Sequence, residues 1–271
     1  TPAAGERVVD AGGLTLAPGF IDTHNHSTEG LLGEPDAASQ VSQGITTLVI
    51  GQDGGSPWPI GAYLDARRKD PPSVNVVMMV GHATVRRQVM GDDFRRTATP
   101  EEIAKMAELV EQAMKEGAAG LSSGLEYEVG SYAATEEVVA LAKAAAKHKG
   151  IYISHIRDEA NLVFEAVREA IAIGEACGIH VQIAHLKLSG TDNWGGAARL
   201  LAEIDTARHR GVRVDVDQYP YTTASNPLRN LLPTWVQEGG METMLQRLAQ
   251  TAARSRLREE IAAEGLNNFG R

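Results

Sequence analysis

The 271-residue sequence contains a single cysteine, Cys177, so it cannot form an intrachain disulfide and is not a disulfide-built secreted fold. It also lacks an apolar run as long as the roughly 18 residues of a membrane span, and it shows no signal-peptide pattern. Basic residues are in the minority, because 26 lysines and arginines stand against 35 acids for a formal charge of −9. This charge has the wrong sign for a general binder of nucleic acid or anionic membranes. We therefore expect a soluble, cytoplasmic, globular protein that binds neither.

The sequence does contain a regular alternation of short apolar runs and helical segments from about residue 14 to residue 217. Seven runs are apolar on both faces, as buried parallel strands are. These runs are LTLAPGFIDTH, GITTLVIG, VNVVMMVGH, AAGLSSGL, GIYISH, GIHVQIAHL and GVRVDVDQY. Of the helical segments between them, residues 99–117 have the clearest start, with Thr99 as N-cap followed by proline and two glutamates. Repeated units in this order predict an α/β fold with right-handed crossovers.

Seven strands are one fewer than an eight-stranded barrel requires. We predict an incomplete barrel over residues 14–219, part of an accessory β-structure over residues 1–13, and a loop and helical insertion over residues 220–271 that precedes a missing eighth strand. The chain is therefore expected to be truncated at both ends. Its first and seventh strands would be unpaired edges, so we expect poor solubility unless a missing C-terminal segment or another copy of the chain completes the barrel.

Four of the eight histidines fall at the ends of the first, fifth and sixth predicted strands. The first two form a His-x-His pair, and residues i and i+2 of a strand point to the same side. All strands of a parallel barrel end on one face, where active sites are built. Neutral imidazole is the commonest ligand for zinc and similar divalent metals. We therefore expect four imidazoles to converge on one metal centre: His24, His26, His155 and His185.

Two acids follow predicted strands on the same face as these histidines. A pair of metal ions needs a bridging anion, usually a carboxylate, and both Asp53 in GQDGG and Glu126 in SSGLEYEVG are candidates. The alternative for either residue is an ordinary solvated loop acid.

Basic side chains also lie near the predicted strand ends. Lys187 follows His185 by two residues, so it projects on the same side and suits an anionic group of a substrate. Arg157 stands in the same relation to His155 and is a second candidate for contact with substrate. His82, at the end of the third strand, is a weaker candidate for the same role.

Five of these motifs together closely resemble the amidohydrolase superfamily, and within it the N-acyl-D-amino-acid deacylase (D-aminoacylase) group. They are APGFIDTHNH, GITTLVIGQDG, GLSSGLEYEVGSYA, ISHIRDEA and IAHLKLSG, within a resemblance that covers about residues 7–225. The resemblance implies a TIM-like (β/α)8 metal-dependent hydrolase barrel with one or two zinc ions and an accessory β-sandwich made from both chain ends. It also implies metal-assisted hydrolysis of N-acyl-D-amino acids, or of related N-acyl amino acids and dipeptides, to a carboxylate and a free amino acid.

The resemblance assigns roles residue by residue. The four histidines match the family's metal ligands, while Tyr127 and Lys187 match side chains that hold the substrate, with Lys187 on its carboxylate. The best-known D-aminoacylases carry a metal-binding cysteine where this chain has Asp53. Glu126 is then the favoured bridge, because other amidohydrolases bridge with a glutamate or a carboxylated lysine at the end of strand four.

The family's catalytic aspartate ends the eighth strand, so no residue of this sequence is assigned that role. Asp215 and Asp217 lie on the seventh strand and do not fill it. Two alternatives stay open. A cyclic-amide hydrolase of the dihydroorotase or hydantoinase kind usually needs a lysine that SSGLEYE does not offer, and a non-catalytic fragment would keep the histidines without turnover.

Overall fold

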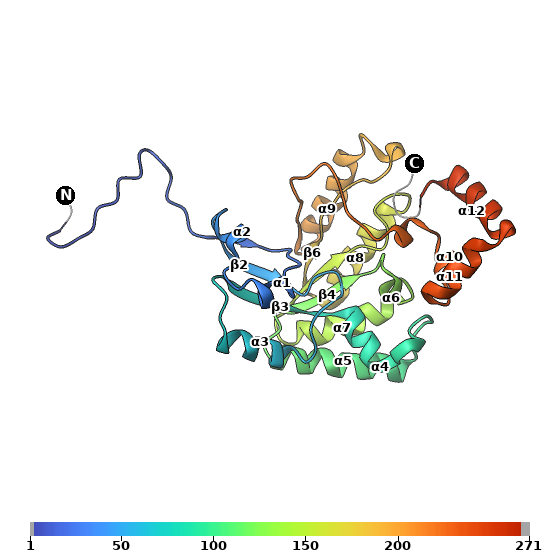
Figure 1. Cartoon of the computed structure of the whole chain (residues 1–271), viewed down its shortest axis with the longest axis horizontal. Helices are drawn as coiled ribbons and strands as arrows, with labels where there is room; N and C mark the ends of the chain where they lie inside the picture. Colours follow the sequence, from blue (N-terminus) through green and yellow to red (C-terminus); the bar gives the residue numbers. More distant parts are fainter. Residues whose placement is uncertain (1–2, 267–271) are drawn as a thin grey trace.

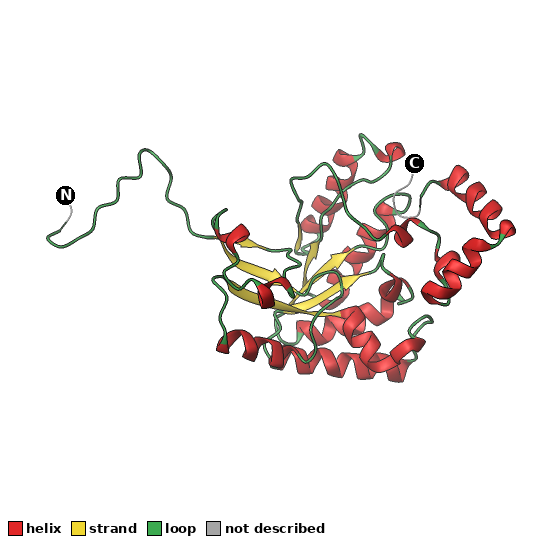
Figure 2. Ribbon diagram, in the orientation of Figure 1, coloured by secondary structure: helices red, strands yellow, loops and turns green. Residues whose placement is uncertain are grey.

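The structure is a computed structural model that describes residues 3–266. Its centre is one curled sheet of seven parallel strands in sequence order, so each strand pairs with the strand that follows it in the chain (Figure 2). The strands are β1 Phe20–Asp22, β2 Ile45–Ile50, β3 Asn75–Gly81, β4 Gly120–Gly124, β5 Ile151–His155, β6 His180–Ile183 and β7 Val214–Val216. Each lies within one of the seven apolar runs, and the predicted α/β fold with seven parallel strands is confirmed.

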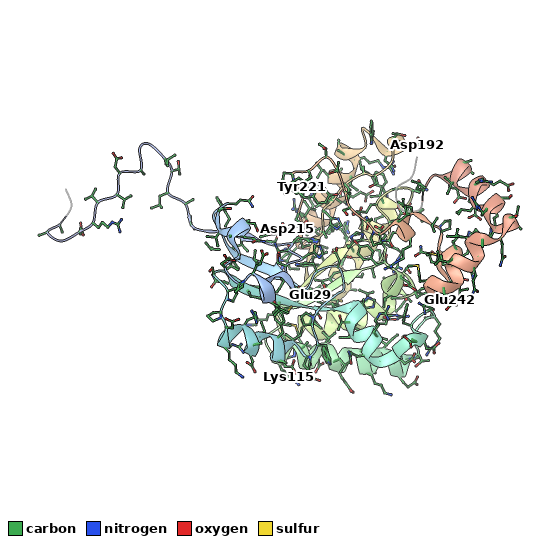
Figure 3. The ribbon with its side chains drawn as sticks, viewed as in Figure 1. Glu29, Lys115, Asp192, Asp215, Tyr221 and Glu242 are labelled. Carbon is green, nitrogen blue, oxygen red and sulfur yellow. The ribbon has the colours of Figure 1, made fainter. Side chains whose placement is uncertain are left out.

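Helices follow the strands and cover the outside of the sheet. Their bounds are α1 Gly30–Gly33, α2 Ala38–Val41, α3 Ile60–Lys69, α4 His82–Met90, α5 Pro100–Lys115, α6 Glu128–Ser131, α7 Thr135–Ala146, α8 Val163–Cys177, α9 Ala197–His209, α10 Thr234–Gln237, α11 Gly240–Ala249 and α12 Thr251–Glu264. Helices α3, α5 and α7 lie along one face of the sheet, and α11 and α12 stand to one side of it (Figure 1). Exposed charged side chains, such as Glu29, Lys115 and Glu242, project around the outside (Figure 3).

Helix α5 begins where its capping signal predicts. The hydroxyl of Thr99 accepts a hydrogen bond from the backbone N–H of Glu102 at 3.3 Å, and the Glu102 carboxylate accepts one from the backbone N–H of Thr99 at 2.8 Å. This reciprocal pair is a capping box, and Pro100 occupies the first helical position, where its missing N–H costs nothing. The buried side of the helix packs into the main core through Met106 and Val110.

The central strands β4 and β5 are buried on both faces, whereas Phe20 and Ile21 of β1 and Val216 of β7 are exposed. Met78 of β3 packs outward into the core that the sheet shares with the helices. Its neighbour Met79 points to the opposite face and packs with Val49, Ile153 and Ala184 in a smaller cluster inside the curl of the sheet. Because successive side chains of a strand alternate between faces, a layer on each side requires apolar residues at every position.

The two ends of the described chain contribute little to this core. Residues 3–19 contain no strand and run away from the sheet, with the side chains of Val8 and Leu16 exposed (Figure 1). Residues 220–227 form a loop before the short 3-10 helix Leu228–Leu231 and α10, α11 and α12, which share a separate small apolar cluster. The domain boundaries, whose outermost residues 1–2 and 267–271 lie outside the described range, stay predictions. None of the helices described is long and apolar enough to cross a membrane.

Candidate metal centre

The four histidines that follow or end strands come together at the carboxyl end of the sheet. The Nε2 atoms of His24 and His26, after β1, lie 3.2 Å apart. Nδ1 of His155, the last residue of β5, lies 2.8 Å from Nε2 of His185, two residues beyond β6. The rings of His24 and His185 are 5.1 Å apart between centroids, which joins the two pairs into one cluster. Ring nitrogens this close need a proton or a cation between them, because an unprotonated nitrogen presents only a lone pair.

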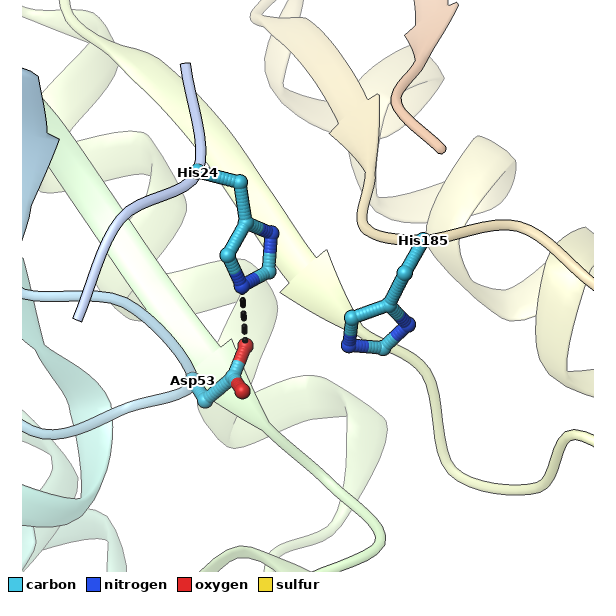
Figure 4. Close-up of side chains that lie close together, drawn as sticks. All are labelled: His24, Asp53 and His185. Carbon is cyan, nitrogen blue, oxygen red and sulfur yellow. Dashed lines mark ion pairs between the residues drawn. The ribbon is translucent and has the colours of Figure 1, made fainter. Parts of the chain in front are cut away.

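The carboxylate of Asp53 lies among these rings. Its oxygens are 3.4 Å from Nε2 of His24, 3.4 Å from Nε2 of His26 and 3.8 Å from Nδ1 of His155. Figure 4 shows Asp53 directed at His24, with the ring of His185 beside them. Nitrogen and carboxylate oxygen atoms of His24, Asp53 and His185 all lie within 4.8 Å of one another, as a set of ligands for one ion does.

The loop that carries Asp53 is fixed by close backbone contacts. Asp53 has a φ of 55°, in the left-handed region, and its carbonyl packs so tightly on Gly124 that a Cβ there would lie 2.4 Å from the oxygen. The hydroxyl of Ser122 donates to the carbonyl of Gly51 at 2.6 Å and accepts from the N–H of Gly54 at 3.2 Å. Left-handed backbone at a residue other than glycine is uncommon and concentrates at functional sites.

Glu126, the expected bridge, lies on the other side of His155. Its carboxylate is 2.6 Å from Nε2 of that ring, whereas Nδ1 is the atom that faces His185 and Asp53. A carboxylate on the remote nitrogen of a histidine fixes the tautomer and the orientation of the ring. Its geometry is therefore that of a residue behind a ligand, and Asp53 is the carboxylate among the four rings.

Two further acids lie against ring nitrogens of the clustered histidines, and the sequence analysis assigns neither of them to the site. Glu159 lies 2.8 Å from Nδ1 of His185. Asp217, directly after β7, lies 3.4 Å from Nδ1 of His24 and accepts a hydrogen bond from the backbone N–H of His185 at 2.6 Å. Asp217 lies at the end of a predicted strand, as the four histidines do. Glu159 lies within the motif ISHIRDEA, so the sequence contained an indication of each residue.

The charges in the cluster shift the pKa values of its members. Burial raises the pKa of Asp53, but contacts with His24, His155 and His26 outweigh burial and hold it far below its usual range. Burial lowers the pKa of His24, but the carboxylates of Asp217 and Asp53 outweigh burial and raise it to about 9. The pKa of Asp217 is likewise held low, against its burial, mainly by His24. The acids of the cluster are therefore charged at neutral pH and attract cations.

Tyr127 and Lys187, the predicted substrate contacts, both lie against the histidines. The hydroxyl of Tyr127 is 3.2 Å from Nδ1 of His155, and burial together with the nearby carboxylates raises its pKa, so it stays protonated. Nζ of Lys187 donates to the Glu159 carboxylate at 2.6 Å and to the carbonyl of His185 at 3.1 Å.

Arg157 and His82, the other predicted contacts, have different partners. The guanidinium of Arg157 binds the Glu169 carboxylate at 2.8 and 2.9 Å and the carbonyls of Ser131 and Ala133. Because β5 ends at His155, the alternation of a strand does not extend to position 157. His82 is fully buried, with Nε2 2.7 Å from the carboxylate of Glu137.

A cavity of about 410 Å³ opens beside the cluster. His26, Asp53 and Tyr127 line one side of it, and residues of the segment 225–230 line the other. Its volume is within the usual range for a site that takes a small molecule.

Comparisons with known proteins show the family of the chain. The profile of the amidohydrolase family matches residues 7–267. The chain belongs to the amidohydrolase family. The D-aminoacylase of Alcaligenes xylosoxydans xylosoxydans is 38% identical over 250 residues, which cover 84% of this chain and 51% of that protein. The N-acyl-D-glutamate deacylase of the same organism is 36% identical over 248 residues, which cover 83% of this chain and 51% of that protein.

A solved structure shares the fold. The N-acyl-D-glutamate deacylase of Bordetella bronchiseptica, in complex with zinc and a phosphonate inhibitor, superposes with a TM-score of 0.72 at 37% identity, over 75% of this chain and 48% of that one. The predicted family and barrel class are thereby confirmed. The chain spans about half the length of the curated relatives it matches.

Proposed function

We propose that this chain forms the metal-binding part of a deacylase that hydrolyses N-acyl-D-amino acids to a carboxylate and a free amino acid. The observation that carries the proposal is the convergence of four imidazoles and one carboxylate at the carboxyl end of a parallel barrel sheet, beside a cavity. Active sites of such barrels are built at this end. Preference for the D stereoisomer is supported by the names of the relatives, D-aminoacylase and N-acyl-D-glutamate deacylase.

We infer that the cluster holds one or two divalent ions, with zinc as the first candidate. Asp53 Oδ1 is buried and makes no full hydrogen bond among residues 3–266, its contact with Nε2 of His24 being 3.4 Å long, so this anionic oxygen is available to a cation in the cluster. Imidazole and carboxylate donors suit zinc and its first-row neighbours. The proposed ligands are His24, His26, Asp53, His155 and His185.

In this proposal Asp53 would hold the ion or ions together with the histidines, and Glu126 would support a ligand. The position of Asp53 between His24, His26 and His155 supports the first assignment. The contact of Glu126 with Nε2 of His155, the nitrogen that faces away from the cluster, supports the second. The bridging role expected for Glu126 is therefore reassigned to Asp53 in our proposal.

The chemistry that a divalent metal supplies when bound is Lewis acidity, which polarises an amide carbonyl and lowers the pKa of water from 15.7 towards about 7. The residues of this chain bind and orient the substrate. Lys187 binds the carboxylate of the amino acid as a point charge. Tyr127, protonated because its pKa is raised, donates a hydrogen bond to the amide oxygen.

Asp217 is not proposed as the general base. One of its oxygens accepts from the backbone N–H of His185, and the other accepts from Nε2 of Gln182 at 2.5 Å. Both oxygens are therefore engaged in holding the strand ends together. The proton transfer from water to the leaving nitrogen is assigned to no residue of this chain.

Zinc binding tests the proposal directly. The whole protein is expected to retain zinc after gel filtration and to unfold at a higher temperature with zinc than with a chelator, because a ligand that binds only the native state stabilises it. His155→Ala and His185→Ala should each lose most of both effects, whereas His209→Ala, an exposed residue at the end of α9, should keep them. Retention of zinc by both variants would contradict the proposed centre.

Substrate class is tested on the whole protein. A panel of N-acetyl-D-amino acids, N-acetyl-L-amino acids and a hydantoin is supplied together with zinc. Hydrolysis of the linear D-amides is expected, and preferential opening of the hydantoin would instead support a cyclic-amide hydrolase. Position 126 counts against that alternative, since the residue there is glutamate rather than the lysine that such enzymes usually carry.

A further inference from the structure

Glu159 contacts both a candidate metal ligand and the candidate substrate-binding lysine through one oxygen atom. Oε1 lies 2.8 Å from Nδ1 of His185 and 2.6 Å from Nζ of Lys187. The carboxylate is almost fully buried, with a side-chain exposure of 6%. Nζ of Lys187 is itself only 3.1 Å from Nδ1 of His185, so the three groups are in mutual contact.

The backbone around Glu159 is held in place, so the carboxylate has a defined position. The carbonyl of Glu159 accepts a hydrogen bond from the N–H of Ser189 at 2.8 Å. One carboxylate oxygen of the preceding residue, Asp158, accepts from the N–H groups of Ala160 and Leu162 at 2.7 and 2.9 Å. These bonds fix the turn after β5 to the segment that follows His185.

We propose that Glu159 is a positioning residue that serves the metal centre and the substrate-binding lysine together, an inference that rests on the proposed function. When the carboxylate accepts the proton on Nδ1 of His185, the lone pair of that ring is on Nε2, the atom directed at His155. The same oxygen fixes Lys187 at a set distance from the cluster, where it can meet the carboxylate of a substrate.

The negative charge of Glu159 has a second effect, on the electrostatics of the centre. An ammonium group 3.1 Å from an atom of a metal ligand repels a divalent cation on that ligand, and the repulsion is strong away from bulk water. The negatively charged carboxylate of Glu159, which contacts both Lys187 and His185, offsets this repulsion. Glu159 also lies within 4.8 Å of ring nitrogens of His155 and His185, but its Oε1 is engaged by Lys187, so we assign it to the position behind His185 and not to the ligand set.

The proposal predicts a specific pattern of zinc affinities. The dissociation constant of the whole protein for zinc is measured by competition with a chromogenic chelator. Glu159→Gln is expected to bind zinc roughly 10- to 100-fold more weakly, the usual cost of losing a carboxylate behind a histidine ligand. Asp158→Asn is the matched control, since it removes the neighbouring negative charge but contacts only backbone N–H groups. Its zinc affinity is expected to equal that of the wild type.

A double variant separates the role of charge from a merely structural role. If Glu159 offsets the charge of Lys187, then Lys187→Met in the Glu159→Gln background should restore part of the lost zinc affinity. A structural role in the turn would give no such rescue, because Lys187→Met adds no packing there. The coupling between the two positions is the difference that a double-mutant cycle isolates.

Three outcomes overturn the inference: wild-type zinc affinity in Glu159→Gln, equal weakening in Asp158→Asn, or no rescue by Lys187→Met. If Glu159→Gln shows no cooperative unfolding, Glu159→Asp replaces it, because the shorter side chain retracts the oxygen from His185 and is expected to weaken zinc binding too. Unchanged affinity in that variant also overturns the inference. Absence of zinc binding in the wild type would instead contradict the proposed function itself.

Discussion

The carboxylate of Glu126 lies 2.6 Å from Nε2 of His155, whereas His185 lies against the other nitrogen of that ring, Nδ1. Asp53, by contrast, contacts the ring nitrogen of His155 that faces the cluster. Asp53 therefore lies within the cluster and Glu126 behind it, and we expect their substitutions to weaken zinc binding to different extents.

We expect Asp53→Asn to lose more zinc than Glu126→Gln. The first change removes a charged ligand atom, whereas the second leaves the proposed ligand set intact and weakens zinc binding by roughly 10- to 100-fold. Zinc content after gel filtration, followed by chelator competition, measures both. The reverse order would identify Glu126 as the shared ligand, in agreement with the expectation from sequence.

Removing the N-cap of α5 should destabilise the fold without affecting the metal centre. Thr99→Ala deletes the hydroxyl that accepts from the N–H of Glu102, and the loss of such a cap costs about 0.5–2 kcal/mol of unfolding free energy. Urea denaturation measures the change. Thr99→Ser keeps the hydroxyl and is the control, so equal losses in the two variants would show that the cap contributes nothing.

The sequence was sufficient to locate the histidines and the cap of α5, because both follow from rules that act locally. Parallel strands end on one face whatever their loops do, so His24 and His185 meet although 161 positions separate their numbers in the sequence. A capping box depends only on residues three apart, which is why the start of α5 at Pro100 was predicted correctly.

These local rules do not predict which way the side chains of the acids and of Arg157 point. Asp53 and His185 have left-handed φ values of 55° and 35°, which strand alternation does not anticipate. Arg157 was placed by extending that alternation beyond the end of β5, where the chain turns and the guanidinium reaches Glu169 instead. The direction of a side chain in a loop depends on tertiary contacts such as those of Ser122 with the Asp53 loop.

The buried acid Glu137 should make stability depend on pH. Burial raises the pKa of Glu137, but His82 and Arg86 outweigh burial and hold it below its usual value of about 4.5. A depressed pKa in the folded state stabilises the protein above the unfolded value, and this contribution is lost as the pH falls through the folded value. The contribution should therefore be complete at neutral pH and decline below about pH 4.5.

Glu137→Gln tests this dependence. At neutral pH it should lose about 3–5 kcal/mol of unfolding free energy, because Arg86 is left buried without a counter-charge. The difference from wild type, measured by urea denaturation, should shrink as the pH falls below about 4.5. Glu136→Gln, at the exposed neighbouring position of α7, should show neither effect. A constant difference at all pH values would mean that packing, not charge, stabilises this cluster.

Lys187 should determine how tightly the substrate binds rather than how fast it reacts. Its ammonium is proposed to contact the substrate carboxylate, which takes no part in the bond that breaks, so we expect the contact to be equally strong in the ground state and the transition state. Loss of such uniform binding raises KM and leaves kcat unchanged. For Lys187→Met in the whole protein, with saturating zinc, we expect KM to rise roughly 10- to 100-fold, as for a lost hydrogen bond to a charged group.

Two controls make the Lys187 prediction specific. Lys115→Met removes an exposed lysine of α5 and should leave both constants unchanged. An N-acetyl-D-amino acid amide, which has no carboxylate, should react equally well with wild type and Lys187→Met, because the interaction that the lysine supplies is absent from both. A fall in kcat with unchanged KM, or an equal loss with the amide, would instead mean that Lys187 acts on the metal centre and does not bind the substrate carboxylate.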